Sequence, residues 1–349
     1  MKYLIIFFAT TLFCYSCQQD SPEAVNEFYH VDVNGAQIQV MLKGNVANDK
    51  IILFLNGGPG LTGIDVGLTN LAAWEENLES QHAVAYFDQR GTGNTLTPID
   101  TSTITLKQFS DDVYAIVKVL KHHHPDAKVY LMAHSFGGLS AADYLINDEY
   151  RAEISGWICV SGYLVPKLSK NWEYRRNWLH YIAELEIEKG NNIAKWEECL
   201  QWLEQTPVIE SDDEKSQWRD YVGNHEEGVV KDADREIATG RVLNLIFNSN
   251  YNLFPVYMSK NQLIVLQTIQ RHYRNDNYLE KIEGIDIPTL FLWGNYDDLV
   301  PFQIGQDAHK AIEHHGKSTF TIMDEAGHEP FLNDSEGFAT IAKDWMEGN

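Results

Sequence analysis

The sequence contains few cysteines, few basic residues and no apolar run long enough to cross a membrane. Four cysteines occur among 349 residues, and Cys14 and Cys17 both lie near the N-terminus. That number is too small for a scaffold held together by disulfides. Cys159 lies in an apolar strand pattern and is expected to be a buried free thiol. A disulfide between Cys159 and Cys199 is a less favoured alternative that an oxidising compartment would allow.

Basic residues are outnumbered almost two to one by acidic residues. Lys and Arg number 27 against 50 Asp and Glu, which leaves a formal net charge of −23. This balance argues against a nucleic-acid-binding protein, because phosphate backbones need clustered Lys and Arg. It also argues against docking on anionic lipid through charge. The acidic residues are spread along the chain, so most are expected on a solvated surface, with a share available to a cationic substrate.

The apolar stretch near the N-terminus spans residues 3–13 after Met1 and Lys2. A basic start before a short apolar region is typical of a secretory signal. Ser16 followed by Cys17 resembles the lipid-attachment site of bacterial lipoproteins. We therefore predict a signal peptide over 1–17, a flexible linker over 18–27, and export to the cell envelope (periplasm or outer membrane), with a lipid on Cys17 as the membrane contact. Cleavage near Ser16 without lipid, giving a secreted protein, is the alternative.

Short apolar runs alternate with helical patterns along most of the chain. Such runs are expected of strands covered on both faces. Their alternation with helices predicts an α/β fold with a doubly wound, mostly parallel sheet. Asn34-Gly35 between two alternating segments predicts a hairpin. The predicted strands are 28–33, 36–42, 51–55, 83–87, 129–134, 154–160, 287–293 and 318–323, and the predicted helices include about 70–80, 106–124, 302–315 and 335–347.

Residues 166–275 interrupt this alternation. They are helical in pattern and rich in aromatic residues, with no strand–helix unit. We interpret this stretch as a helical cap inserted between two core segments, 28–165 and 276–349. Its aromatic side chains are expected to form the core of the cap more often than a substrate-binding wall.

A strand that turns sharply into a helix is predicted around Ser135. The stretch Ala133-His134-Ser135-Phe136-Gly137 follows an apolar run and precedes a helical pattern. Small residues two positions either side of a Ser are typical of the nucleophile elbow, a strained turn that leaves the hydroxyl above the sheet edge. The usual first Gly is replaced by Ala133, which is also small. Ser135 is therefore the predicted nucleophile.

Asp297 and His328 each follow a predicted strand, and the chain order Ser, Asp, His is that of α/β hydrolases. His328 is predicted to take the proton of Ser135 and later to protonate the leaving group. Asp297 is predicted to orient and stabilise the imidazole. Asp298, the adjacent carboxylate, is the alternative acid.

Asn56-Gly57-Gly58-Pro59-Gly60 follows another predicted strand. Glycines there allow the backbone itself to approach a substrate. The N–H groups of Gly57 and Gly58 are predicted to face the developing oxyanion, and the Phe136 N–H is predicted as the second donor.

Taken together, these motifs resemble one family. Asn-Gly-Gly-Pro-Gly, Asp-Gln-Arg-Gly-Thr-Gly (88–93), Ala-His-Ser-Phe-Gly-Gly, Gly-Asn-Tyr-Asp (294–297) and Gly-His, in this order, look like proline iminopeptidases of the α/β-hydrolase superfamily. The family's first motif usually begins with His, where this chain has Asn56. The resemblance implies release of N-terminal residues, often proline, from short peptides. It also implies carboxylates in the cap that hold the free amine.

Two other functions stay open. A carboxylesterase or other acyl hydrolase could use the same three residues, because no cap signature of the family matches residues 166–275. A surface-binding protein on an inactive scaffold is opposed by the intact Ser135, Asp297 and His328. Substrate-binding residues remain unassigned, with a small molecule or short peptide expected as the substrate.

Several other polar residues are assigned structural roles. His134 is expected to point away from the site, and Asp88 and Arg90 are expected to form an ion pair that braces their loop. His122, His123 and His124 are consecutive and so cannot share a helix face, which argues against a metal. His314 and His315 precede the last strand and are poor bases. Neither a metal nor a cofactor is predicted. Three cap carboxylates, more often solvated than bound to a substrate amine, are Glu173, Glu184 and Glu188.

Overall fold

The computed structural model describes residues 24–68, 74–95, 99–223, 251 and 261–349. The expected signal peptide over 1–17 and residues 18–23 of the expected linker lie outside these ranges, as do residues 224–250 and 252–260 of the predicted cap. Among the helices of the described ranges, none combines the length and apolarity needed to cross a bilayer.

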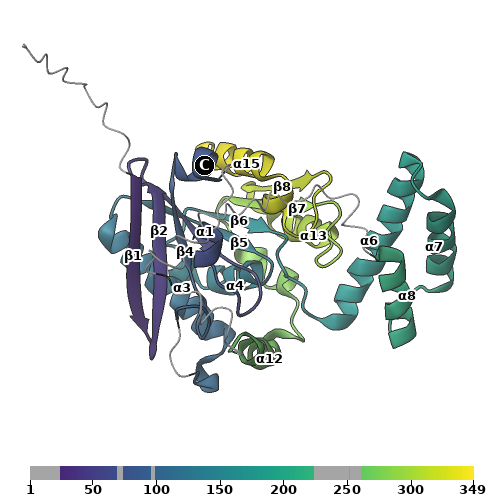
Figure 1. Cartoon of the computed structure of the whole chain (residues 1–349), viewed down its shortest axis with the longest axis horizontal. Coiled ribbons are helices and arrows are strands. Elements are labelled where there is room, and N and C mark those ends of the chain that lie inside the picture. Colours follow the sequence, from purple (N-terminus) through teal and green to yellow (C-terminus); the bar gives the residue numbers. More distant parts are fainter. Residues whose placement is uncertain (1–23, 69–73, 96–98, 224–250, 252–260) are drawn as a thin grey trace, which may run out of the picture.

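A single eight-stranded sheet forms the centre of the molecule (Figure 1). Its order is β1-β2-β4-β3-β5-β6-β7-β8. The β1–β2 and β2–β4 pairs are antiparallel and the remaining pairs are parallel, which confirms the predicted mostly parallel sheet. The strands are β1 (Ala24–Val33), β2 (Ala36–Asn45), β3 (Lys50–Leu55), β4 (Ala83–Phe87), β5 (Lys128–His134), β6 (Gly156–Val160), β7 (Thr289–Gly294) and β8 (Ser318–Met323).

The first hairpin is longer than the sequence suggested. Asn34 and Gly35 both have positive φ, 43° and 79°, as a tight two-residue turn requires. β1 begins at Ala24, which pairs with Asn45 of β2. The predicted flexible linker over 18–27 is therefore wrong for residues 24–27, because their backbone groups are paired in the ladder.

Helices cover both faces of the sheet, which explains why β4, β5, β6 and β7 are almost entirely buried. One apolar cluster joins the sheet to α3, α4 and α13, and a second joins it to α1, η1 and α15. The helices and short helical turns are α1 (Ile64–Leu68), η1 (Glu75–Glu79), η2 (Thr101–Thr103), α3 (Leu106–His123), α4 (Phe136–Leu145), α5 (Asp148–Arg151), α6 (Leu168–Lys189), α7 (Ile193–Gln205), α8 (Asp212–Val222), α12 (Asn261–Tyr273), η3 (Tyr278–Glu280), η4 (Ile282–Gly284), α13 (Phe302–Ile312), η5 (Glu313–His315), α14 (Pro330–Asn333) and α15 (Ser335–Glu347).

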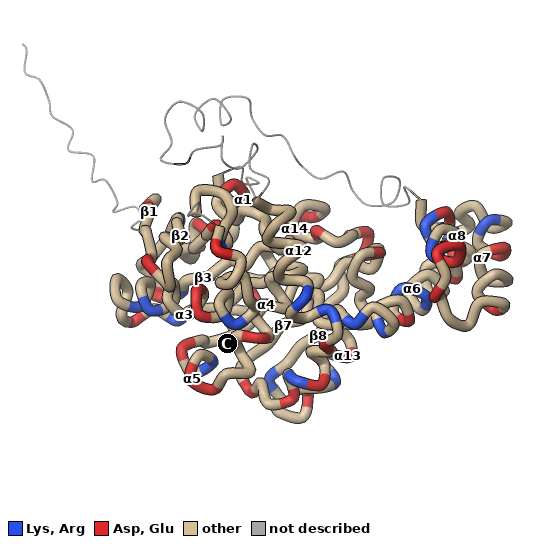
Figure 2. Tube along the Cα trace, turned by 90° about the horizontal axis from the view of Figure 1, so that it is seen from below, with Lys and Arg blue, Asp and Glu red and all other residues tan. Residues whose placement is uncertain are grey.

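The insertion after β6 forms a helical lobe of α6, α7 and α8 that projects from one side of the core, past α13 (Figure 1). Its interior is aromatic, with Trp178, Trp196 and Trp218 at most 3% exposed. α12, from the same predicted cap, instead contacts α3 of the core. Acidic and basic residues are interspersed over core and lobe in Figure 2. Cys159 and Cys199 are both buried and both free.

Candidate active site

Ser135 stands at the sharp turn between β5 and α4. Its φ of 53° and ψ of −119° are strained for a residue with a side chain. The turn is held because the Ser135 N–H donates to the Val160 carbonyl (3.0 Å) and the Tyr163 N–H donates to the Ser135 carbonyl (2.9 Å). A Cβ on Gly137 would lie 2.1 Å from the Leu55 carbonyl oxygen, so only Gly fits there. These contacts leave the Ser135 hydroxyl at the carboxyl edge of the sheet.

The His328 ring lies between Ser135 and Asp297. His328 Nε2 is 3.0 Å from the Ser135 Oγ, and Nδ1 is 2.9 Å from Asp297 Oδ2. A carboxylate only accepts, so Nδ1 carries the proton and donates to it. In neutral imidazole Nε2 then has a lone pair, and that lone pair faces the hydroxyl of Ser135. This tautomer is the one a general base at Ser135 needs.

Asp297 is fully buried and belongs to the acid loop, residues 295–300. Its Oδ1 accepts from the N–H groups of Leu299 (3.1 Å) and Val300 (2.7 Å). Asp298 makes no hydrogen bond to His328. Its pKa is raised by burial and by the neighbouring Asp297. Of the two carboxylates that the sequence left open, the structure brings Asp297 to the imidazole.

Two indole groups hold the acid loop in position. Trp178 of α6 donates from Nε1 to the Asn295 carbonyl, and Trp293 of β7 donates from Nε1 to the Val300 carbonyl, both at 3.0 Å. The Tyr296 hydroxyl donates to the buried Glu186 carboxylate at 2.7 Å. The loop that carries the acid is thus fixed from the core and from the inserted helix. Helical periodicity alone contained no signal for Glu186 or Trp178 in this role.

His134 does not point away from the site, contrary to the prediction. Its Nε2 lies 2.9 Å from the His328 carbonyl oxygen, and the two rings are 4.8 Å apart. Because a carbonyl only accepts, Nε2 is the protonated nitrogen. Burial and the adjacent His328 lower the pKa of His134 to about 3. His134 is therefore a neutral donor that holds the backbone of His328, the residue whose ring contacts Ser135.

The predicted oxyanion donors differ in their availability. The Gly57 N–H donates to the Asn56 side-chain oxygen at 2.8 Å, so this donor is occupied in this structure. Asn56 is the residue that replaces the family's usual His, and its short side-chain amide accepts from the N–H of the following residue, Gly57. The N–H groups of Gly58 and Phe136 are not hydrogen-bonded to other described residues. These two remain the candidate pair.

Asp88 and Arg90 do not pair with each other, contrary to the prediction. Asp88 accepts from the N–H groups of Gly63 (3.1 Å) and Asn94 (2.9 Å), and burial raises its pKa to about 7. Arg90 instead pairs with the buried Asp112 of α3, with Nε 2.8 Å from Oδ2. Residues two apart in a turn diverge, so each finds a partner that is distant in sequence.

Gln89, between them, contacts the oxyanion loop, residues 56–60. Its Nε2 donates to the carbonyls of Asn56 (2.9 Å) and Gly57 (3.0 Å). Its Oε1 accepts from the Gly60 N–H at 2.8 Å. The Asp-Gln-Arg-Gly and Gly-Gly-Pro-Gly motifs therefore form one hydrogen-bonded unit. The motif in the sequence gives no sign of this role for Gln89, because its partners lie about 30 residues away along the chain.

The three cap carboxylates lie at solvent-exposed positions of α6, as expected. Glu173 is exposed and paired with Lys170 (2.7 Å), and Glu184 is exposed beside His180 (3.4 Å). Glu188 is exposed as well. Within the described ranges, no group of His, Cys, Asp or Glu is arranged to hold a metal ion.

The fold and the site together define an α/β hydrolase. A family model described as the alpha/beta hydrolase fold matches residues 50–335, and the chain belongs to this family. It is 22% identical over 315 residues to the probable aminopeptidase YbaC of Bacillus subtilis, which covers 88% of this chain and 92% of the relative. It is 24% identical over 302 residues to the proline iminopeptidase of Thermoplasma volcanium, covering 85% and 89%.

Among solved structures, an esterase from Exiguobacterium antarcticum has a similar fold. Its TM-score is 0.58 at 16% identity, and the match covers 93% of this chain and 100% of that one. At this identity the likeness concerns the fold alone, and the resemblance to proline iminopeptidases is supported by the curated relatives.

Proposed function

We propose that the protein is a serine hydrolase in which Ser135, His328 and Asp297 act as a catalytic triad. The observation that carries this proposal is the continuous line of hydrogen bonds, 3.0 Å from Ser135 Oγ to His328 Nε2 and 2.9 Å from His328 Nδ1 to Asp297. In the tautomer required by the carboxylate, the lone pair of Nε2 faces the Ser135 hydroxyl and can accept its proton.

The reaction follows from this geometry. Ser135 Oγ attacks the substrate carbonyl carbon while His328 Nε2 takes its proton. The negative charge on the former carbonyl oxygen is stabilised by the N–H groups of Phe136 and Gly58. The imidazolium, stabilised by Asp297, then protonates the leaving amine or alcohol, and an acyl-enzyme remains. Water, deprotonated by His328, attacks the acyl-enzyme and releases the acid and free Ser135.

The preferred substrate class is a short peptide with a free N-terminal amine, and the N-terminal residue that is released is often proline. Full-length relatives named as a proline iminopeptidase and a probable aminopeptidase support this choice. The second candidate is a carboxylesterase. It is favoured by one observation, since the three cap carboxylates considered as possible partners of an amine are exposed and Glu173 is ion-paired.

Free-amine and blocked substrates separate the two candidates. Proline and alanine 4-nitroanilides, their N-acetyl derivatives and 4-nitrophenyl acetate are assayed with the protein. An aminopeptidase is expected to lose about 100-fold or more in kcat/KM on acetylation, because a carboxylate built to meet an ammonium is left unpaired. Turnover of the ester with none of the free amines would reject the aminopeptidase and favour the esterase. A fluorophosphonate that labels the parent protein and not Ser135→Ala tests the nucleophile itself.

We further propose that the protein is exported and that a lipid on Cys17 is its contact with the membrane. The basic start, short apolar region and Ser16-Cys17 pair support this proposal. Expression of the full chain with radiolabelled palmitate should label the parent protein and leave Cys17→Ala unlabelled. Equal labelling, or none, would contradict lipidation at this residue.

A further inference from the structure

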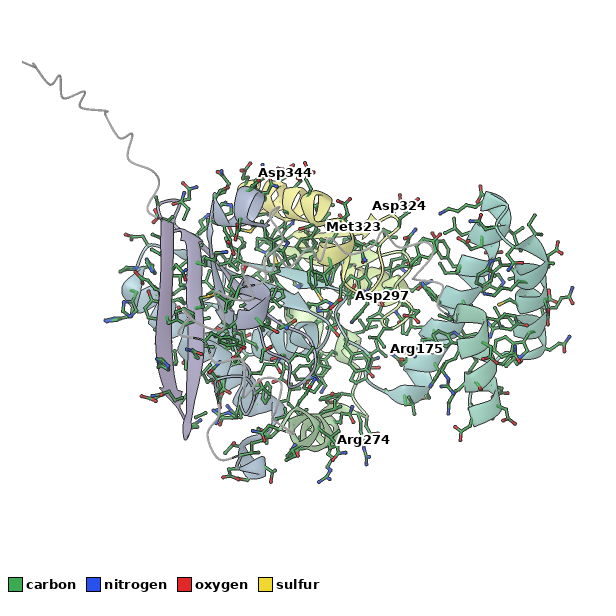
Figure 3. The ribbon with its side chains drawn as sticks, viewed as in Figure 1. Arg175, Arg274, Asp297, Met323, Asp324 and Asp344 are labelled. Atoms are coloured by element: carbon green, nitrogen blue, oxygen red, sulfur yellow. The ribbon has the colours of Figure 1, made fainter. Side chains whose placement is uncertain are left out.

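Arg175 lies on α6 at the base of the helical lobe, where the lobe meets the acid loop (Figure 3). Its Nη2 donates to the Leu299 carbonyl oxygen at 2.9 Å. The guanidinium carbon is 5.2 Å from the ring centre of Trp172 and 5.3 Å from that of Trp218. Two indole rings and one backbone carbonyl therefore hold this cation in a defined position.

Most donors of this guanidinium are not used by the described part of the chain. Arg has five N–H groups, and the Arg175 Nε is buried without a hydrogen-bond partner. The charges of Asp298 and Asp297 act on Arg175, yet neither carboxylate forms an ion pair with it. A buried donor without an acceptor costs free energy, so an acceptor supplied by a ligand would be stabilising there.

Arg175 lies beside the loop that carries Asp297, because its Nη2 contacts Leu299, two residues further along that loop. Asp297 in turn contacts His328, whose Nε2 is 3.0 Å from the Ser135 Oγ. In the proposed reaction His328 protonates the leaving group, so that part of the substrate departs beside the imidazole and the acid loop.

We propose that Arg175 binds a carboxylate on the leaving-group part of the substrate. This proposal rests on the proposed serine hydrolase function, and it restricts the preferred substrates to those with a carboxylate on the leaving group. For an aminopeptidase the preferred substrates become dipeptides, because their C-terminal carboxylate lies one residue beyond the bond that is cut. A planar guanidinium matches a carboxylate through two parallel N–H bonds, which a neutral amide in the same place cannot replace.

Binding is measured in the Ser135→Ala background, so that the result does not depend on turnover. Two matched ligand pairs are titrated by calorimetry: prolyl-alanine with prolyl-alaninamide, and 4-acetoxybenzoate with its methyl ester. In at least one pair, the compound with the free carboxylate is expected to bind about tenfold more tightly than the amide or ester that lacks this charge, which is called the neutral partner. Adding Arg175→Gln should remove that preference and leave the affinity for the neutral partner unchanged.

Lys170→Gln is the matched control, because it removes the same charge from an exposed, ion-paired position of α6. It is expected to keep the carboxylate preference. Equal affinities for charged and neutral ligands in Ser135→Ala, or no binding of any of the four compounds, would overturn the proposal without any substitution at Arg175. An equal loss for both members of a pair in Arg175→Gln would also overturn it and assign the residue to holding the acid loop. Turnover by the unsubstituted protein separately tests the serine hydrolase.

Discussion

Replacement of Gln89 by Met is expected to lower catalysis more than any loss of stability would explain. Gln89 is 4% exposed and forms three hydrogen bonds to the oxyanion loop, at 2.8, 2.9 and 3.0 Å. Met keeps the length and much of the volume of Gln but cannot form these bonds. Each neutral hydrogen bond contributes about 1 kcal/mol net. We therefore expect the free energy of unfolding to fall by about 3 kcal/mol.

The kinetic effect has a different origin. Gly58 precedes Gly60 by two residues in a loop whose position is set by the bonds of Gln89 to Gly57 and Gly60. If the loop shifts, the Gly58 N–H no longer points at the developing negative charge. Loss of one such donor lowers kcat by about 100-fold or more. KM is expected to change little, because the interaction is made mainly in the transition state.

The assay combines urea unfolding with steady-state kinetics on 4-nitrophenyl acetate at a temperature where the variant is fully folded. Gln108→Met is the matched control. Gln108 is half-buried and bonds to Asp112 and Asn34, each at 2.9 Å, without contact to residues 56–60. It should lose stability with little change in kcat. A folded Gln89→Met variant with kcat within threefold of the parent would refute the role assigned to this side chain.

Three further predictions concern the proposed triad and its neighbour. Ser135→Ala and His328→Ala should each lower kcat by about 1,000-fold or more. The double variant should be no worse than either single variant, because residues that act as one catalytic unit have non-additive effects. Asp297→Asn should cost about 10,000-fold because it disturbs the His328 tautomer, whereas Asp298→Asn should stay within tenfold; the reverse order would assign the acid to Asp298. Burial lowers the pKa of His134 from 6.5 to about 3, so the unfolded chain binds a proton below pH 6.5 that the folded protein does not. The stability due to this group is present above pH 6.5 and should fall by about 2 kcal/mol by pH 5, and His134→Gln should flatten this part of a urea-unfolding profile.

The sheet and the chain order of the site residues could be predicted from the sequence because their signals are local. Continuous apolar runs such as 83–87 and 129–134 are buried on both faces, and β4 and β5 coincide closely with them. Ala133 and Gly137, two positions either side of Ser135, are small, and a Cβ on Gly137 would lie 2.1 Å from the Leu55 carbonyl oxygen. Such steric demands act within a few residues, so they leave a readable pattern.

The partners of polar residues could not be predicted in the same way, because they come from distant parts of the chain. The alternation of side chains along a strand suggested that His134 points away from Ser135, but the positive φ of Ser135 reverses the chain there. His134 thereby meets the loop of His328, 194 residues further on. Arg90 and Asp112 are 22 residues apart in the sequence and are joined by the packing of α3 on the sheet.

One face of α6, in the helical lobe, holds the loop that carries the proposed acid. Arg175, Trp178 and Glu186 contact Leu299, Asn295 and Tyr296 in turn. At 3.6 residues per turn these three positions fall within about 80° of the helix circumference. The proposed carboxylate binding by Arg175 and the orientation of His328 by Asp297 therefore involve neighbouring positions on one helix face. A substitution at Trp178 or Glu186 on this face is expected to lower kcat, whereas a substitution at the exposed Glu184 on the same helix should leave kcat unchanged.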